Sequence, residues 1–319
     1  MSTRAWVAFA SMSVLWGIPY LLIKVAVDDG VPPGFVAWIR VVLGAVVLLA
    51  LAPRRGAVRA LRGRLRWLAA FAVAEVVVPF PLIAYGEQHV SSSLTAILIA
   101  SAPLFVALLA LRFDADERVG GRRLAGLLIG LAGVVALVGI DVAGRPDELW
   151  GALAVLGAAL GYAVGPMILK RHLSGLDARL SMGTSLALAA VFLAPAAAFD
   201  PPAAVPSGPA LASLAALGLL CTAAAFVVYS RLVAEVGAGR ALVITYVNPV
   251  VALALGVLIL GERPGAGTII GLVLILAGSW LSTDGRLPWR GRGGHGAPAV
   301  GPSQEHAREP SVDRVGSGE

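Results

Sequence analysis

Four ionisable residues stand in, or at the ends of, stretches of sequence that are otherwise almost purely apolar. Arg40 and Glu75 lie well inside two of these stretches, and Lys24 and Lys170 lie near the ends of two others. An ionisable group in the hydrocarbon of a membrane is costly, so by default it marks a substrate or ion pathway. We interpret Glu75 as a ligand for a substrate amine or as a proton-coupling carboxylate. The alternative is a structural ion pair with Arg40 that locks two helices together.

The depths of Arg40 and Glu75 are compatible with proximity. In uniform helices that rise 1.5 Å per residue, Arg40 would lie roughly 10 Å from the outer face and Glu75 roughly 12 Å from the cytoplasmic face. In a hydrocarbon layer about 30 Å thick, their backbones then differ in depth by roughly 8 Å. An arginine side chain is long enough to close much of this gap, so we expect the two groups to lie near each other.

The two lysines are unusual in a chain whose other 23 basic residues are all arginine. Lys24 and Lys170 are 146 residues apart. We interpret them as a pair of gate or coupling residues, one near each membrane face. The alternative is snorkelling, in which the stem lies in lipid and the ammonium reaches the interface.

Several aromatic and amide side chains lie within the apolar stretches, next to the predicted helix breaks or to the prolines that the two halves share. They are Trp16, Tyr20, Tyr162, Tyr246 and Asn248. Aromatic rings with a polar tip suit an amphipathic substrate pocket, and a buried amide needs a partner. We therefore expect these residues, with Arg40 and Glu75, to line a substrate cavity. Helix packing is the alternative for each of them.

Other polar residues fall at the predicted outer ends of helices. Glu87, with its neighbours Gln88 and His89, ends one apolar stretch, and we expect solvent to satisfy these side chains. Glu262 begins the last helix, where we interpret it as a group at the start of a helix, with a gate role as the alternative.

The residues of enzyme chemistry are missing from the sequence. It contains no H-E-x-x-H, no G-x-S-x-G and no clustered Asp motif. The single cysteine, Cys221, excludes an intramolecular disulfide and a cysteine metal cluster, and the four histidines do not cluster. We therefore predict no enzyme activity, no catalytic residues, no metal site and no cofactor.

The elements that carry these residues are membrane-spanning helices. The 319 residues are 58% hydrophobic and 14% charged, with a mean hydropathy of +0.85, against about 25% charged residues in soluble domains. A spanning helix needs about 20 apolar residues. Runs of that kind occur ten times, at 5–26, 33–52, 67–88, 91–111, 124–140, 149–169, 180–199, 210–230, 241–260 and 265–283. The sequence therefore predicts an all-α polytopic protein of the cell membrane with ten transmembrane helices.

The basic residues set the orientation. With a cytoplasmic N-terminus, 21 of the 25 basic residues fall on the cytoplasmic side, and only Arg145 and Arg263 fall on the other. Cytoplasmic loops carry such an excess, so we predict that both termini are cytoplasmic. The basic excess then reports topology, and no nucleic-acid partner is expected. The last residues, 286–319, are rich in Gly, Pro, Arg and Glu and are predicted to be a disordered cytoplasmic tail.

The two halves of the chain align at an offset of about 146 residues. Pro103 then matches Pro249, and Trp16 matches Tyr162. We predict two five-helix repeats, residues 1–141 and 142–285. Because five is odd, the two repeats must cross the membrane with opposite topology, as inverted repeats of transporters do.

Prolines occur at matching places in these repeats, and such breaks point to a transport site. Pro19 in the first helix corresponds to Pro166 in the sixth, and Pro103 to Pro249; we expect all four to break their helices. Glycines spaced by four residues, at 157, 161 and 165 and at 126 and 130, predict close helix packing and leave a homodimer open.

These features together resemble the EamA family of the drug/metabolite transporter superfamily. The resemblance lies in LWGIPYLLIK at 15–24, in Arg40, in the Pro103 and Pro249 positions, and in LGERP at 260–264. It covers about residues 5–285. The family implies a ten-helix secondary transporter, most often an exporter of small metabolites or drugs.

The sequence departs from the family pattern at three places. The second half has Tyr162-Ala163 in place of Trp-Gly, Leu186 stands where Arg40 would repeat, and RFDADER at 112–118 replaces a clean LGE. We therefore expect functionally unequal halves.

The predicted function is alternating-access export of a small metabolite, amino-acid-like, or of a drug across the cell membrane. The expected partners are this small-molecule substrate and the lipid bilayer. Glu75 is a candidate for proton coupling, and facilitated diffusion is the alternative. A phosphorylated substrate would need several cations in the cavity, and only Lys24, Arg40 and Lys170 are available. An integral membrane enzyme and a receptor or scaffold without transport are the alternatives.

Overall fold

The structure is a computed structural model, and it describes residues 2–53, 56–113, 121–236 and 243–282. The predicted tail, 286–319, lies outside the described residues, as do residues 54–55, 114–120 and 237–242. Within the described ranges, the regular elements are all helices. The first half contains α1 (Thr3–Gly17), α2 (Pro19–Asp28), α3 (Pro33–Leu51), α4 (Ala57–Leu61), α5 (Leu65–Ala72), the π-helix η1 (Val73–Val77), α6 (Pro79–His89), α7 (Ser92–Ile99), α8 (Ala102–Phe113), α9 (Gly121–Leu137) and the π-helix η2 (Val138–Val142). The second half contains α10 (Pro146–His172), α11 (Ala178–Phe199), α12 (Gly208–Gly218), the π-helix η3 (Leu219–Ala224), α13 (Ala225–Val236), α15 (Ile244–Ile259) and α16 (Ala266–Ser282).

Eight helical segments of the described chain are long and apolar enough to cross a membrane. They are Thr3–Asp28, Pro33–Leu51, Leu65–His89, Ser92–Leu109, Gly121–Val142, Pro146–His172, Ala178–Phe199 and Gly208–Val236. The last two of the ten predicted spans correspond to α15 and α16, apolar helices of 16 and 17 residues. The structure thus has the expected order of apolar helices, with two that are shorter than a full span.

Local sequence explains where the helices begin. Proline stands at the first turn of α2, α3, α6, α10 and α12, where its missing N–H costs no helical hydrogen bond. Side-chain oxygens cap other starts: Ser91 accepts from the Leu94 N–H, and Asp177 accepts from the backbone N–H groups of Arg179 and Leu180. Slight burial raises the pKa of Asp177, but these bonds and the Arg179 guanidinium hold it below its ordinary value.

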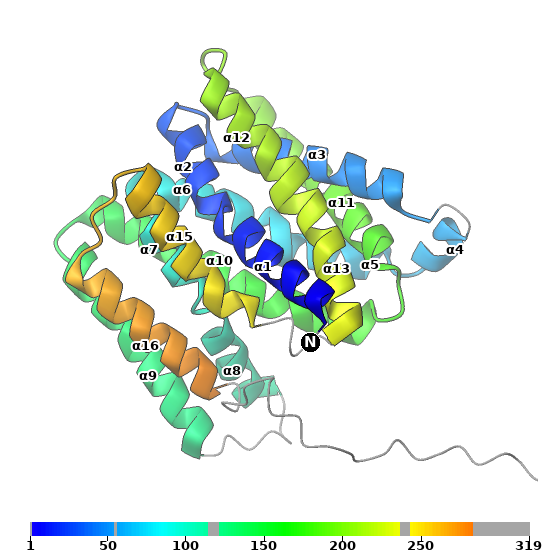
Figure 1. The fold of residues 1–319 in the computed structure, drawn as a ribbon. Coiled ribbons are helices and arrows are strands. Elements are labelled where there is room, and N and C mark those ends of the chain that lie inside the picture. The colour runs from blue at the N-terminus through cyan, green and yellow to red at the C-terminus, as the bar shows by residue number, and fades with distance from the viewer. Residues whose placement is uncertain (1, 54–55, 114–120, 237–242, 283–319) are drawn as a thin grey trace, which may run out of the picture. The chain divides into compact units, whose positions relative to one another are not determined.

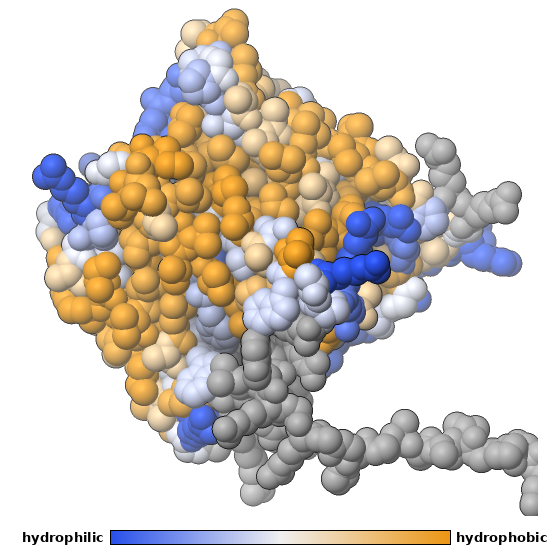
Figure 2. Space-filling view, in the orientation of Figure 1, coloured by the Kyte–Doolittle hydropathy of each residue, from blue (hydrophilic) through white to orange (hydrophobic). Residues whose placement is uncertain are grey.

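The surface of the helices is apolar. Leu258 is 81% exposed and Val191 is 67% exposed, and many other large apolar side chains are exposed on several helices. Figure 2 shows apolar residues spread over the face in view, with hydrophilic residues gathered toward its edges. Water would disfavour such a surface, whereas lipid tails match it.

Helices of the first half pack mainly against helices of the second half. α9 lies beside α16, α3 beside α11, and α10 beside α6 (Figure 1). α2 packs on α12, α1 on α15, and α10 also on α7 and α8. At the offset of 146 residues, α1 and α2 correspond to α10, α6 corresponds to α13, and α8 corresponds to α15. Exchange of equivalent helices between the halves therefore turns the α10–α6 pair into α1–α13, and the α10–α8 pair into α1–α15.

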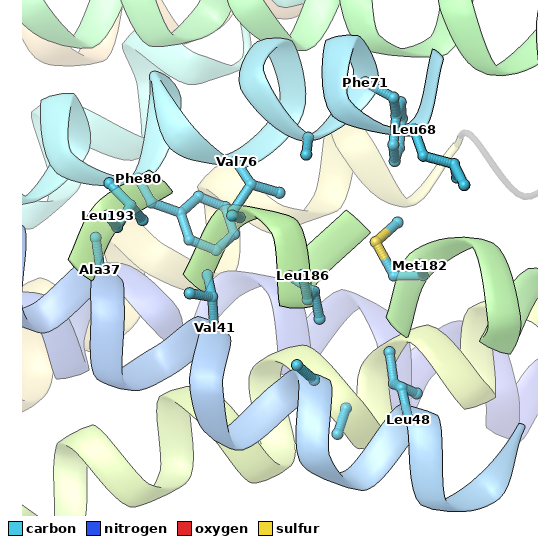
Figure 3. Packing of buried hydrophobic residues seen from close by; sticks show 14 of the residues in the cluster. Ala37, Val41, Leu48, Leu68, Phe71, Val76, Phe80, Met182, Leu186 and Leu193 are labelled. Atoms are coloured by element: carbon cyan, nitrogen blue, oxygen red, sulfur yellow. The ribbon is translucent and has the colours of Figure 1, made fainter. Parts of the chain in front are cut away.

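A large apolar cluster lies between α3, α5, α6 and α11. Figure 3 shows Val41 and Leu48 of α3 with Leu186 of α11 and Phe80 of α6 in this cluster. Leu186, the residue that replaces Arg40 in the second half, is fully buried there. At this position the second half therefore has an apolar side chain that packs in the core, where the first half has the charged Arg40.

Two of the π-helical turns are in equivalent places. Leu219, the first residue of η3, lies 146 residues after Val73, the first residue of η1. The offset equals the one that aligns the two halves of the sequence. Single π-turns are rare and occur frequently at functional sites.

The prediction of four helix breaks is half wrong. The chain bends at Ile18, so that Pro19 starts a new helix, and Pro103 lies in the first turn of α8 after a gap at Ala100 and Ser101. Pro166 and Pro249 instead lie inside the uninterrupted helices α10 and α15. An interior proline removes one hydrogen bond and can bend a helix without ending it, and the prediction did not separate these two outcomes.

Candidate functional site

Arg40 is buried where the two halves meet. The residue is 8% exposed on α3, and its Nε donates a hydrogen bond of 2.9 Å to Thr222 Oγ1 on η3. The Thr222 hydroxyl donates in turn to the Leu217 carbonyl at 2.8 Å, which leaves its oxygen as the acceptor for Arg40. The guanidinium carbon lies 4.0 Å from the centre of the Phe80 ring. These contacts fix the plane of the guanidinium group.

The polar groups around Arg40 come from both halves. Tyr20 on α2 and Glu87 on α6 belong to the first half, and Tyr162 on α10 and Cys221 on η3 belong to the second; all four lie close enough to interact electrostatically with the Arg40 guanidinium. No ion pair or further hydrogen bond to Arg40 is made by the residues that the structure describes. We call Tyr20, Arg40, Tyr162, Cys221 and Thr222 the Arg40 cluster.

Glu75 lies in η1 and faces α10. Its Oε2 atom is enclosed and has no hydrogen-bond partner among the described residues. A Cβ atom on Gly165 would overlap this carboxylate oxygen, so the glycine of α10 makes room for the Glu75 side chain. The phenol groups of Tyr162 and Tyr229 lie close enough to interact with the charge of Glu75.

The alternative of a structural ion pair between Arg40 and Glu75 is therefore not realised among the described residues. Arg40 points to Thr222, and Glu75 points to Gly165. The depth argument assumed uniform helices of 3.6 residues per turn. Glu75 instead lies in a wider π-turn, which changes the direction of the side chains along the third span.

Trp16 belongs to an aromatic group between α1 and α13. Its ring lies 4.9 Å from that of Tyr229, at 40°, and 6.0 Å from that of Phe226, at 74°. Trp16 lies two residues before the bend at Ile18. Tyr229 lies close enough to Glu75 to interact with it electrostatically.

Asn248 and Tyr246 bind neighbouring helices. With the side-chain amide oriented to satisfy its surroundings, Asn248 Nδ2 donates to the carbonyls of Ser13 (3.2 Å) and Ile244 (2.9 Å). Tyr246 donates its hydroxyl to the Ser279 carbonyl at 3.4 Å. The structure therefore places the amide of Asn248 between α15 and α1, separate from the Arg40 cluster.

The two lysines are in different surroundings. The Lys24 ammonium donates to the Glu87 carbonyl at 2.8 Å and pairs with Asp28 at 2.9 Å, so it joins α2 to α6. Lys170 is exposed at the end of α10, without a hydrogen bond or ion pair to the described residues.

The expectation that solvent satisfies Glu87 at the end of a helix is wrong. The residue is 0% exposed, and neither carboxylate oxygen has a hydrogen-bond partner in the described part of the chain. Burial follows from the close approach of α6 to α10, where a Cβ on Gly86 would overlap Val155 and lie 3.0 Å from the Gly151 carbonyl. Sequence position alone could not show this approach.

Glu262 caps a helix of the other half. One carboxylate oxygen accepts from the Ser92 N–H at 2.7 Å, and the other accepts from the N–H (3.1 Å) and the hydroxyl of Ser93. The predicted role at a helix start is thus correct in kind, but the helix is α7 and not the following α16.

The glycines of both stripes lie at contacts between helices of the same chain. Gly157, Gly161 and Gly165 on α10 face the third span, and Gly126 and Gly130 on α9 face Gly278 of α16 or Leu104. These contacts account for both stripes without a second copy of the chain.

Sequence reasoning missed Thr222, Phe80 and Tyr229. One signal was available: Cys221 and Thr222 lie 146 residues after Glu75 and Val76, so the repeat offset itself joins η3 to η1. In the described residues, no group of three or more His, Cys, Asp or Glu side chains could hold a metal ion.

Comparison with known proteins gives one consistent family. The model of the EamA-like transporter family matches residues 4–139 and again residues 149–283. An "uncharacterized transporter", YoaV of Bacillus subtilis, is 27% identical over 88% of this chain and 97% of its own length. The "uncharacterized inner membrane transporter" YedA of Escherichia coli is 28% identical over 86% of this chain and 91% of its own.

Two further matches concern substrate and fold. A "probable amino-acid metabolite efflux pump" of Escherichia coli is 25% identical over 91% of this chain and 98% of its own length. A protein of known crystal structure superimposes with a TM-score of 0.60, covering 89% of this chain and 97% of the other, at 21% identity. The last likeness shows the fold.

Proposed function

Because the chain belongs to the EamA-like transporter family and is a multi-pass transporter of the cytoplasmic membrane, we propose that it exports a small, amino-acid-like metabolite or a drug by alternating access. The moving parts are two inverted five-helix repeats, residues 1–141 and 142–285, with ten spans and both termini in the cytoplasm. The two family matches support a duplicated unit. The similar efflux pump supports the direction and the substrate class.

The observation that carries this proposal is the packing between the halves. The pairs α10–α6 and α1–α13 exchange when the halves are exchanged, as do α10–α8 and α1–α15. Two inverted repeats joined in this way have two equivalent arrangements, because each contact of one half has a counterpart in the other. The Arg40 cluster draws residues from both halves, so a substrate held there would meet both moving parts.

Glu75 is the proposed coupling residue. An isolated carboxylate in hydrocarbon is costly, so Glu75 needs either a proton or a cation as its partner. Glu75 lies opposite Gly165 and near the phenol groups of Tyr162 and Tyr229, and it forms no ion pair with a described residue. Its carboxyl group is therefore free to take up and release a proton or a cation during transport.

Substrate counterflow in proteoliposomes tests the proposal. Vesicles with the purified full-length chain are loaded with an unlabelled amino acid, and uptake of the same labelled amino acid is followed. We expect transient accumulation that empty vesicles lack, for at least one member of an amino-acid and cationic-drug panel. Absence of counterflow for the whole panel by folded protein would instead favour an enzyme, a receptor or a scaffold.

A further inference from the structure

We propose that Arg40 binds the carboxylate group of the substrate, so that the transported molecule carries a single carboxylate, as an amino acid does. The inference rests on the proposed transport function and names the substrate group and the residue that holds it.

Arg40 is a buried cation that has no counter-ion among the described residues. It is 8% exposed in a membrane protein, and its one hydrogen bond within the described part of the chain goes to the neutral hydroxyl of Thr222. Glu87 is the one carboxyl among its charged neighbours in the described chain, yet no hydrogen bond or ion pair joins the two. A guanidinium group in this position costs free energy unless an anion neutralises it.

The N–H groups of Arg40 that remain available to a ligand lie together on one edge of the guanidinium group. Thr222 occupies Nε, and the Phe80 ring covers one face of the group. The edge formed by Nη1 and Nη2 donates no hydrogen bond to the described residues, and neither atom is fully enclosed. Two parallel N–H groups on such an edge match the two oxygens of a carboxylate.

The single cation at this site favours a carboxylate over a phosphate as the bound anion. A phosphate group carries more charge and needs several cations. Lys24 is already bound to Asp28 and to the Glu87 carbonyl, and Lys170 is exposed at a helix end, so neither adds to the site. The neighbours of Arg40 are the hydroxyls of Tyr20 and Tyr162, which donate to no described residue and can complete the hydrogen bonds of one carboxylate.

Pairs of amino acids and their amides test the inference, because each pair differs mainly in the carboxylate. The probes are leucine with leucinamide and phenylalanine with phenylalaninamide. Each is measured as a competitor of counterflow and as a thermal stabiliser of the purified full-length protein. For the unaltered protein we expect the acid to act at concentrations about tenfold or more below those of the amide, since charged hydrogen bonds are the strong ones.

The matched variants are Arg40→Gln, Arg40→Lys and, as a control, Arg64→Gln. Arg64 is a half-buried arginine between α4 and α5 that donates to the Ser174 carbonyl at 3.2 Å. Arg40→Gln is expected to abolish the preference for the acid, and Arg40→Lys to weaken acid binding on the order of 10- to 100-fold, because an ammonium lacks the paired edge. Arg64→Gln is expected to keep the full preference.

The outcomes separate this inference from the transport function. Counterflow with equal use of acids and amides, or full acid preference in folded Arg40→Lys, would overturn the role of Arg40 and leave transport standing. If Arg40→Gln does not fold, the Arg40→Lys protein, which keeps the charge, decides alone. Absence of counterflow and of stabilisation for every probe would overturn both statements.

Discussion

The contact between α9 and α16 allows a stability prediction with a worked magnitude. A Cβ atom on Gly278 would lie 2.5 Å from the Gly130 Cα and 2.6 Å from the Gly126 carbonyl oxygen. Ordinary carbon contacts lie at about 3.5–4.0 Å, so the two helices would have to separate locally by roughly 1 Å. The clashing atoms are backbone and cannot rotate away. Overpacking of this kind costs about 1–3 kcal/mol.

We therefore expect Gly278→Ala to lower the midpoint of thermal unfolding by several degrees, measured on the purified protein in one detergent. Gly139→Ala is the matched control, because a Cβ at that exposed position would meet no atom within 4 Å. The control should be neutral or slightly stabilising, since alanine is the better helix former. Equal midpoints for Gly278→Ala and the unaltered protein would refute the close-packing argument.

Three further changes follow from single contacts. Glu262→Ala removes the cap of α7 and should lower the free energy of unfolding by about 1–2 kcal/mol. Its control is Glu148→Ala, which breaks the surface ion pair with Arg145 and should change the stability by less than about 1 kcal/mol. Thermal unfolding of the two variants compares these effects. Thr222→Val removes the acceptor of a buried guanidinium and should cost about 1–3 kcal/mol in the same assay, and an unchanged midpoint would contradict this. Lys24→Met should slow counterflow several-fold while Lys170→Met should not, because Lys24, unlike Lys170, links two spans of the described chain. Equal counterflow rates for the two variants would contradict this and would indicate that both lysines act only at the membrane interface.

Much of the fold is predictable from the sequence because lipid imposes a simple rule. Apolar runs of sufficient length become helices, and the repeat offset of 146 residues joins equivalent elements in the two halves. The same offset relates η1 to η3, but the residue types in these segments do not predict a π-turn. The consequence of Pro19 was also foreseeable, but Pro166 shows that a proline alone does not decide between a bend and a break.

The site was less predictable because it depends on how helices approach one another. Arg40 was identified from its charge within an apolar run, but its partners Thr222 and Phe80 are ordinary residues of membrane helices. Glu87 was expected to be solvated because its distance from the predicted membrane edge was short, and a glycine contact between α6 and α10 buries it instead.

The proposed mechanism requires alternating access to the Arg40 cluster, and the single cysteine of the chain allows this access to be measured directly. Cys221 is 2% exposed and lies within reach of the Arg40 charge. A membrane-impermeant thiol reagent is applied to proteoliposomes from outside or sealed inside, with Cys221→Ser as the unlabelled control. The account predicts that Cys221 reacts slowly from each side and that a transported amino acid changes both rates. Reaction from neither side, or from one side only regardless of the amino acid, would contradict it.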